Sequence, residues 1–479
     1  MALDSKWRKR LMVLGMIALV GGGALGLFAW YKFFREVDEP AFASLEERYK
    51  YGSIGAESKA GLPYWIWVVL PRVFPDYVPG TGGYRAFGVA WEEGHEMPIG
   101  FTKKTIGFPR VANNCAICHT TSYKLTPDDK PRFVPSGPGG TNIQALLRFF
   151  SRCANDSRFN ADTLLAEIKQ HAPLSFIDRL IYRYVLIPRT RQALVDRDGQ
   201  FAWMNRAHIP DWGPGRDDPM NLTKYFMTKV PVDNSVGQAD FPSTWNLSIR
   251  EGKMLNWAGE TPSPRSVILD SALGLQAKPD SHFQHHVDWI QQFLRQKQPP
   301  KFPFPVDERL AGRGKNIFDA QCNSCHGLGP GTKVGTVIDI AEIGTDRERL
   351  DTWTKVAADA ANKAVADLGI HRVGLTKTNG YQAVPLDGIW LRGPYLHNGS
   401  VPNLSDLLEP ADKRTKVFYR GYDLIDPVHV GFDSECPEAQ RTGFRVDTAE
   451  RGNGNGGHNY GTNLPRPDKQ ALVEYLKTL

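Results

Sequence analysis

Two copies of one five-residue motif constrain this chain more than any other feature. Residues 115–119 read Cys-Ala-Ile-Cys-His, and residues 322–326 read Cys-Asn-Ser-Cys-His. Cys-x-x-Cys-His is the attachment pattern of c-type haem, in which both thiols bond to the haem and the adjacent histidine ligates the iron. The sequence therefore predicts two covalently bound haem c groups. Their predicted attachment and proximal-ligand residues are Cys115, Cys118, His119, Cys322, Cys325 and His326.

Zinc sites and redox-active dithiols also use Cys-x-x-Cys pairs, but neither explains the histidine that follows each pair. A structural zinc site would need Cys118 and Cys322, about 200 residues apart, to converge on one ion, and it would leave both histidines unexplained. A redox-active dithiol does not need the trailing histidine. The two remaining cysteines, Cys153 and Cys436, are open to either a disulfide in an oxidising compartment or two buried thiols.

The amino terminus carries a segment long enough to cross a membrane. Residues 11–30 contain no charged side chain, and such a run spans a hydrocarbon core of about 30 Å as a helix. Four cations precede this run: Lys6, Arg8, Lys9 and Arg10. The positive-inside rule then places residues 1–10 in the cytoplasm and the rest of the chain outside. We therefore predict a single-pass anchor in the cell inner membrane, with the haem domains in the periplasm.

A cleaved signal peptide is the alternative interpretation of this segment. Its apolar region usually has about 7–15 residues, with a small-residue cleavage site close behind. The nearest Ala-x-Ala, residues 41–43, lies beyond a charged stretch. Trp30 and Tyr31 also suit the interfacial belt of a spanning helix. Under either interpretation the rest of the chain is exported.

The charge distribution gives no reason to expect a nucleic-acid partner. The whole chain carries a net charge of +6, and residues 1–32 account for +4 of it. The exported part is therefore nearly neutral and lacks the basic surface that nucleic-acid binding needs. Hydrophobic residues make up 41% of the chain and charged residues 23%, which excludes disorder as well.

Helical periodicity is the clearest secondary-structure signal. We predict a mainly α protein with extensive coil, in which a transmembrane helix precedes two cytochrome c-like haem domains. The predicted division is residues 1–35 for the basic tip and anchor, 36–300 for an N-terminal haem domain and 301–479 for a C-terminal cytochrome c domain. Residues 33–110 are predicted to be irregular wrapping, and the Pro-rich residues 298–305 a linker. Predicted helices fall at 142–153, within 161–205, at 286–296, from 306 to 322 and at 467–479.

The segment 386–408 carries a resemblance to a known family. It contains Pro394-Tyr-Leu-His-Asn-Gly399 and resembles the dihaem cytochrome c peroxidase superfamily, for which that core is a signature. The fuller pattern is most similar to the branch that contains the dihaem rubber oxygenases, and the resemblance spans residues 90–479. The segments that support it are 241–246, 255–257, 417–422, 426–431 and 457–461.

The resemblance implies a division of labour between the two haems. The amino-terminal haem is where H₂O₂ or O₂ reacts, and the carboxy-terminal haem stores and relays electrons. A tryptophan often lies on the route between the haems in this family, and Trp257 resembles it; the alternative is an ordinary buried aromatic residue. The family often carries Ca²⁺ between its domains, so calcium is an open further cofactor, although no ligand set for it can be picked out of this sequence.

His458 is the predicted sixth ligand of the carboxy-terminal haem. It lies just before the last predicted helix, where cytochrome c folds place that ligand. Peroxidases of the family often have Met at this position, and a second histidine lowers the reduction potential relative to His/Met ligation. The alternative is a surface histidine in the Gly-rich loop 452–457.

Three further residues are predicted to lie near the haems, the first two on the basis of the resemblance. Leu273 falls near the apolar distal residue of the rubber-oxygenase branch, which predicts an open, apolar pocket at the amino-terminal haem. His397 is predicted to contact a propionate or the region between the haems. The alternatives are direct ligation of the iron and a structural hydrogen bond in a turn. Arg392 is predicted to pair with a haem propionate, because arginine suits bidentate contacts to carboxylates. The alternative is an arginine exposed at the surface. Other candidates for the sixth position of the amino-terminal haem are His95, Met97, His208, His282, His285, His286 and His371.

These features predict a periplasmic haem oxidoreductase that reduces H₂O₂ or activates O₂. Its electrons would come from a redox donor protein or a membrane electron-transport component. The alternative is a pure electron-transfer cytochrome, in which both irons carry two protein ligands. A third hypothesis is a maturation enzyme that oxidises a partner protein. The anchor argues against rubber cleavage, because an enzyme that attacks an external polymer would be released.

Overall fold

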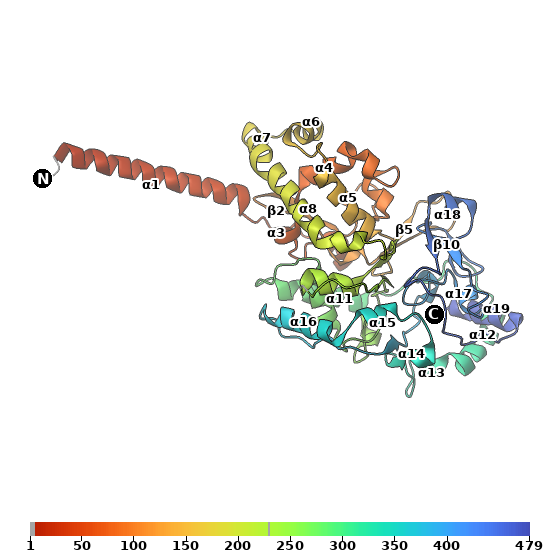
Figure 1. The fold of residues 1–479 in the computed structure, drawn as a ribbon. Helices are drawn as coiled ribbons and strands as arrows, with labels where there is room; N and C mark the ends of the chain where they lie inside the picture. The colour runs from red at the N-terminus through yellow and green to blue at the C-terminus, as the bar shows by residue number, and fades with distance from the viewer. Residues whose placement is uncertain (1–4, 229) are drawn as a thin grey trace.

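The computed structural model describes residues 5–228 and 230–479, and one helix projects from the body of the protein (Figure 1). This helix, α1 (Ser5–Phe33), has 29 residues and therefore spans about 44 Å at 1.5 Å per residue. Among the described residues it is the one helix that is long and apolar enough to cross a membrane. None of its apolar window is buried against the protein.

The first segment after α1 is more regular than its sequence predicts. It contains α2 (Leu45–Tyr51), α3 (Glu57–Ala60) and α4 (Tyr64–Val73). It also forms a sheet in the order β1-β3-β2, with strands Leu62–Pro63, Phe108–Asn113 and Phe101–Ile106. The expectation of irregular wrapping over 33–110 is therefore wrong for these parts. The hairpin turns at Gly107, whose φ of +71° suits glycine.

Helices α5 to α8 form a layer beside the end of α1 (Figure 1). They are α5 (Ile143–Asn155), α6 (Ala161–His171), α7 (Phe176–Ile181) and α8 (Ile187–Phe201), with a π-helical turn at Tyr182–Leu186 between the last two. Asn142, Asn160 and Ser175 cap the first three by accepting a hydrogen bond from a first-turn backbone N–H. The helices predicted at 142–153 and within 161–205 are confirmed.

The middle of the chain is built on α10 (Pro264–Gly274) and α11 (Phe283–Gln296). They share a core with Ala116 of the first motif. The predicted helix at 286–296 is confirmed and starts three residues earlier. Shorter helices complete this region: α9 (Pro219–Asn221), α14 (Ile340–Ile343), α15 (Glu348–Thr352) and α16 (Lys355–Ala366).

The carboxy-terminal part packs α12 (Glu308–Gln321) against α19 (Arg466–Leu476). Gly314 permits this close crossing, because a Cβ there would lie 1.9 Å from the carbonyl oxygen of Ala471. Both helices agree with the prediction, and residues 298–305 contain neither helix nor strand, as expected of a linker. The remaining helices are α13 (Asn323–His326), α17 (Leu404–Leu407) and α18 (Pro437–Thr442).

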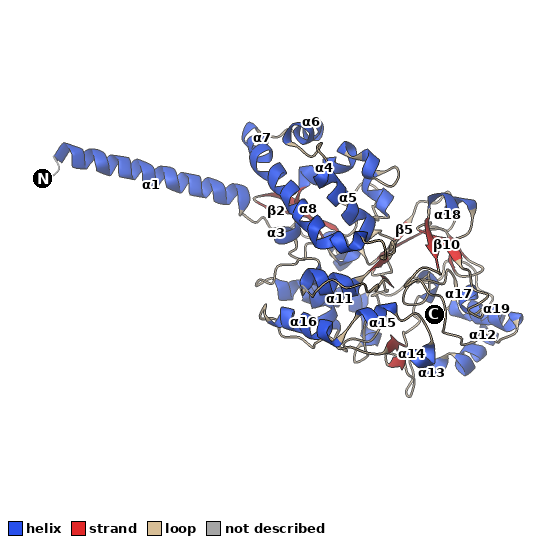
Figure 2. Ribbon diagram, viewed as in Figure 1, coloured by secondary structure: helices blue, strands red, loops and turns tan. Residues whose placement is uncertain are grey.

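The other strands are short antiparallel pairs scattered among helices and loops (Figure 2). The pairs are β4 (Thr120–Tyr123) with β5 (Arg132–Pro135), β6 (Arg216–Asp217) with β7 (Ala239–Asp240), β8 (Val337–Asp339) with β9 (Gly380–Gln382), β10 (Val417–Arg420) with β13 (Phe444–Asp447), and β11 (Ile425–Asp426) with β12 (Gly431–Phe432). The chain is thus mostly helical with extensive coil.

Side chains from both halves of the chain share one core. Tyr123 and Trp245, from the amino-terminal side of the linker, are buried in one cluster with Trp390 and Leu472. The indole of Trp245 also donates a hydrogen bond to the carbonyl of Asp387 at 3.1 Å. The two halves therefore hold each other in place, and the division between 36–300 and 301–479 stays a prediction.

Cys153 and Cys436 are free thiols. Cys153 is fully buried on α5, whereas Cys436 is partly exposed and caps α18 by accepting a hydrogen bond from the backbone N–H of Ala439. The structure therefore contains no disulfide between them, and only one of the two is a buried thiol.

Candidate haem centres

The two Cys-x-x-Cys-His motifs lie at the ends of different supporting elements. The first follows β3 and begins a short 3₁₀ turn at Cys115. Asn114 fixes that turn, because its side chain accepts from the backbone N–H of Ala116 and donates to the carbonyls of Tyr49 and Gly52. The second motif follows α12 directly and forms α13. A helix running into the second motif agrees with the prediction.

Both motif histidines are oriented by the same kind of contact. Nδ1 of His119 lies 3.0 Å from the carbonyl oxygen of Pro242, and Nδ1 of His326 lies 2.8 Å from that of Val384. A carbonyl only accepts, so Nδ1 carries the proton in each ring and Nε2 carries the free lone pair. Metal-ligating histidines are usually oriented in this way by their second nitrogen. Both rings therefore present the nitrogen that haem ligation requires.

Burial keeps these imidazoles neutral. It lowers the pKa of His119 to about 4, more than the Pro242 carbonyl raises it. Burial also lowers the pKa of His326, with a smaller contribution from the nearby Arg392. A neutral imidazole is the form that ligates iron, so both residues fit a haem at neutral pH.

His458 faces His326 across the second motif. Their ring centroids lie 6.2 Å apart, with an angle of 49° between the planes. Two imidazoles that ligate one metal ion from opposite sides, each at about 2.0–2.1 Å, have centroids roughly 6 Å apart. Burial, followed by the neighbouring His326 and Arg414, lowers the pKa of His458 to about 3. The pair therefore has the spacing and the protonation state of two axial ligands.

Arg414 holds the loop that carries His458, and sequence reasoning missed it. Its guanidinium is 2% exposed and donates to the carbonyls of Asn455 at 2.6 Å, Gly457 at 2.9 Å and His458 at 3.3 Å. His458 itself has a φ of +47°, in the left-handed region. The only sequence signal for this arrangement was the glycine-rich composition of the loop.

Trp257 connects the two segments that orient the motif histidines. Its indole Nε1 donates to the carbonyl of Asp240 at 2.7 Å, two residues before Pro242. Its own carbonyl accepts from the backbone N–H of Gln382 at 2.9 Å, two residues before Val384. Trp257 is therefore bonded on one side to the segment that holds His119 and on the other to the segment that holds His326.

His397 is buried beside the same junction. Its ring stacks on Tyr381 at 3.9 Å, and its Nε2 lies 2.9 Å from the Tyr381 hydroxyl. Its carbonyl accepts from the backbone N–H of Asp240, the residue that also bonds to Trp257. The structure thus gives His397 a hydrogen-bonding role between the two motifs. The carboxylate of Asp240 pairs with the buried Arg420 at 2.5 Å, a contact that sequence reasoning also missed.

Arg392 and Leu273 lie near the second and first motif, respectively. Arg392 donates to the carbonyl of Pro385 at 2.6 Å, and within the described chain it forms no ion pair with a carboxylate. Burial lowers its pKa to about 10, so it remains charged and available to a carboxylate. Leu273 is 6% exposed on α10, in the core that contains Ala116.

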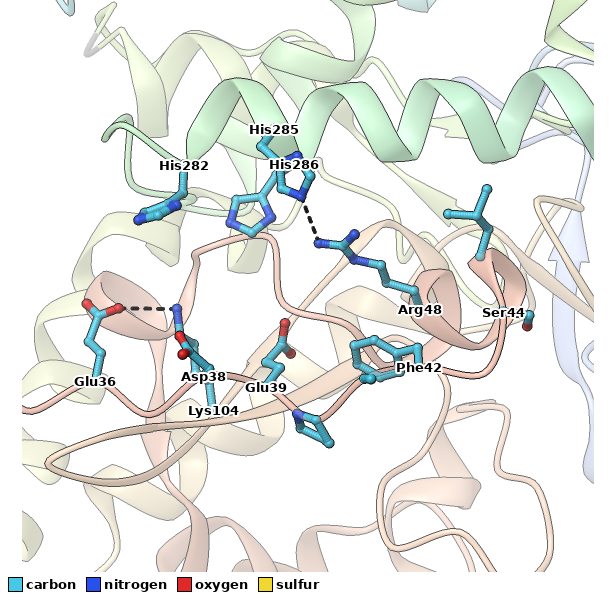
Figure 3. Close-up of a pocket in the computed structure, with 13 residues that line it drawn as sticks. Glu36, Asp38, Glu39, Phe42, Ser44, Arg48, Lys104, His282, His285 and His286 are labelled. Atoms are coloured by element: carbon cyan, nitrogen blue, oxygen red, sulfur yellow. Dashed lines mark hydrogen bonds and ion pairs between the residues drawn. The ribbon is translucent and has the colours of Figure 1, made fainter.

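The candidates for a sixth ligand of the first haem scatter. His282, His285 and His286 line an open cavity of about 530 Å³ beside the segment that follows α1, where Glu36 and Arg48 also lie (Figure 3). The other three histidines, His95, His208 and His371, are exposed, and His95 stacks on Tyr51. Met97 is buried.

Met97 differs from these histidines because it shares a core with Ile117 of the first motif. The ring of His119 lies 6.3 Å from that of Phe241, and among the described residues none of the candidate histidines stacks on it. No cluster of three or more His, Cys, Asp or Glu that could hold a metal ion lies in the described chain, so calcium stays without a ligand set.

Comparison with known proteins supports part of this picture. Residues 380–419 match the family model RoxA-like, cytochrome c-like. The chain therefore carries a cytochrome c-like region, which points to covalent haem c. The match contains Arg392 and His397 and overlaps the segment on which the family resemblance was based. The placement in one branch of the dihaem superfamily stays a prediction.

Two relatives come from Sinorhizobium fredii, and neither has an assigned activity. Uncharacterized protein y4iJ is 28% identical in an alignment of 480 residues. The match covers 77% of this chain and 77% of the relative. Uncharacterized protein y4iM is 28% identical over 287 residues, 50% of this chain and 64% of the relative. A hydrazine synthase structure from Kuenenia stuttgartiensis matches with a TM-score of 0.26 and 16% identity, covering 51% of this chain and 73% of that one; this score does not establish a common fold.

Proposed function

We propose that this chain is a membrane-anchored, periplasmic c-type cytochrome with two haems of different function. The carboxy-terminal haem relays electrons, and the amino-terminal haem reduces H₂O₂ or activates O₂. The observation that carries this proposal is an asymmetry: both motif histidines have the same support at Nδ1, but within the described part of the chain only His326 faces a second imidazole. Haem supplies the redox chemistry, and a free axial position lets its iron react with small oxidants.

The residues at the amino-terminal motif suit a reactive site. Cys115 and Cys118 would anchor the haem, and His119 would ligate it from one side. The core that contains Ala116 and Leu273 is apolar, so water would be excluded from that side of the group. Such an environment strengthens the electrostatic effect of the few polar groups present.

The residues at the carboxy-terminal motif suit storage and relay. Cys322 and Cys325 would anchor the haem, with His326 and His458 as axial ligands. Arg392 would offset a propionate charge beside His326. Because protein side chains would fill both axial positions, the ligand atoms would change position little when the iron changes oxidation state.

Trp257 is the proposed bridge for electrons. One of its hydrogen bonds is to the backbone of β7 and the other to the backbone of β9. Two residues beyond these contacts lie the carbonyls that bond to His119 and His326. Trp257→Phe keeps an aromatic ring, smaller than the indole, but removes the Nε1 donor, so we expect intramolecular electron transfer to slow several-fold with both haems retained. Stopped-flow spectroscopy after rapid mixing of the reduced protein with H₂O₂ measures this rate.

Trp289→Phe is the matched control for Trp257→Phe. Trp289 is buried, whereas Trp257 is partly buried, and its one Nε1 contact is to His286 at 3.4 Å, within α11. The control should leave the rate unchanged. Equal rates in Trp257→Phe and the native chain would remove Trp257 from the route.

Arg414 is the proposed positioning residue for His458. Arg414→Leu removes charged hydrogen bonds to three loop carbonyls, so we expect it to destabilise the protein by about 2–4 kcal/mol and to lower the low-spin fraction of the carboxy-terminal haem. Thermal unfolding and the optical spectrum measure the two effects. Arg441→Leu, which loses only an exposed pair with Glu438, should change neither.

A pure electron-transfer cytochrome is the second candidate, and Met97 is the observation that favours it. Met97 is buried in the core that contains Ile117, next to the first motif. A thioether ligand from Met97 would fill the sixth position and block small oxidants. Met97→Ala separates the two candidates: it leaves the spectrum of the amino-terminal haem unchanged under the first and converts that haem to a CO-binding form under the second.

The haem count tests the proposal as a whole. We expect the pyridine haemochrome assay and the intact mass to give two haem c groups per chain. We also expect the half-reduced protein to consume H₂O₂. One haem per chain, or two haems with no reaction towards H₂O₂ or O₂, would contradict the proposed reaction.

A further inference from the structure

An apolar surface without a protein partner lies beside the end of α1. It is formed by α7 and the π-helical turn that follows, and we call it the α7 face. Four of its side chains are unusually exposed for their type: Phe176 (71%), Ile177 (47%), Leu180 (40%) and Tyr184 (71%). Exposed apolar clusters of this kind mark surfaces that are covered in use.

The spacing of these residues places them on one side of a continuous helix. Positions i, i+1, i+4 and i+8 from Phe176 fall on a common face at 3.6 residues per turn. The opposite side carries Tyr182 and Leu186, which are buried in the large amino-terminal core. The helix is therefore apolar on two sides, and only one of them is covered by the protein.

The position of the α7 face is fixed relative to the anchor. Nζ of Lys32, in the last turn of α1, lies 2.7 Å from Oδ1 of Asp178 on α7. Figure 1 shows α7 next to the point where α1 meets the body of the protein. The same end of α1 exposes Trp30, Tyr31 and Phe34. Two apolar surfaces thus meet at one level of the molecule.

We propose that the α7 face lies in the interfacial layer of the bilayer that α1 crosses. This inference rests on the proposed membrane anchor. Aromatic side chains such as Phe176 and Tyr184 are favoured at that depth, and the exposed Arg179 of the same helix suits anionic lipid headgroups. A lipid surface is the occupant that the geometry selects, because the anchor ends where the face begins.

Seating on the membrane would fix the orientation of the whole protein. With only α1 in the bilayer, the body would swing on a single helix; a second contact removes that freedom. Figure 1 places α12 and α19, which flank the second motif, on the side of the body away from α1. The carboxy-terminal motif would then face the periplasm, where a soluble electron donor can reach it.

Site-specific photocrosslinking of the full-length holoprotein tests this. Phe176→p-benzoylphenylalanine places the probe on the α7 face, and Val428→p-benzoylphenylalanine places it on an equally exposed apolar position of the carboxy-terminal part, 68% exposed. Each protein is reconstituted into vesicles of phosphatidylethanolamine and phosphatidylglycerol, irradiated and analysed by mass spectrometry. We expect lipid adducts at position 176 to exceed those at position 428 several-fold.

The outcomes separate this inference from the anchor on which it rests. The intact mass reports whether residues 1–35 are retained. Retention with equal adducts at both positions overturns the α7 face and leaves the anchor standing. A chain that lacks α1 and forms no adduct overturns both. Adducts between two protein chains at position 176 overturn the lipid assignment in favour of a second copy.

Discussion

His458→Ala is expected to open the carboxy-terminal haem to external ligands. The native ring faces His326 at 6.2 Å, and removing it frees the second axial position. We expect CO to bind the reduced carboxy-terminal haem of this variant and not that of the native chain. His458→Met should keep the haem six-coordinate but raise its midpoint potential by on the order of 0.1 V, within the ~0.8 V range that axial ligands control. CO difference spectra and a redox titration measure these effects.

The control for these variants is His429→Ala. The His429 side chain is exposed, and its Nδ1 lies 2.7 Å from the carboxylate of Asp426, so its loss should change neither CO binding nor potential. A His458→Ala protein with the native spectrum and no CO adduct would show that His458 is the surface residue of a glycine-rich loop. Arg414 would then stabilise that loop without serving the haem.

Removing either pair of motif cysteines is expected to remove one haem. The activity that is lost should differ between the two pairs. Cys115→Ser with Cys118→Ser should abolish the reaction with H₂O₂ while leaving a low-spin haem on the second motif. Cys322→Ser with Cys325→Ser should leave a haem that still responds to CO but stop turnover with an external donor. Haem content per chain and peroxide consumption are the two measurements.

Cys436→Ser is the matched control for the cysteine variants. The thiol of Cys436 caps α18 by accepting from Ala439, and serine is among the best residues for that position. This variant should therefore retain two haems and full activity. Loss of both haems from each double variant would mean that the motifs fold as one unit, and the division of function would need another test.

The sequence was most informative where one local pattern decides the structure. The haem motifs are defined by fixed spacing, and the helices α5, α11, α12 and α19 follow from apolar residues at helical intervals, with a side-chain N-cap on α5 and α12. Proline-rich composition located the linker for the same reason. In each case the chain segment needs no distant partner to adopt its conformation.

The features that sequence reasoning missed depend on distant contacts. The hairpin of β2 and β3 is half-exposed and contains Pro109, so its sequence does not alternate as a strand should. Arg420 pairs with Asp240 across 180 residues, and Arg414 reaches a loop more than 40 residues away. No local pattern identifies such partners, because each arginine alone is as compatible with the surface as with the interior.

The sequence also did not predict which side of α7 is exposed. Its sequence predicts a helix within 161–205, and the helix forms, but apolar residues are spread around it and do not say which side is covered. Only the packing of Tyr182 and Leu186 shows that Phe176 and Tyr184 point outwards. Its proximity to the anchor likewise depends on the pairing of Lys32 with Asp178.

The central claim is that the two haems differ in axial ligation. An optical and EPR titration of the purified full chain, oxidised and half-reduced, with and without H₂O₂ or CO, tests it most directly. We expect one low-spin haem whose spectrum neither ligand changes and one haem, on His119, with a high-spin signal that changes when either ligand is added. Two low-spin haems that respond to neither ligand would contradict it and leave an anchored electron carrier.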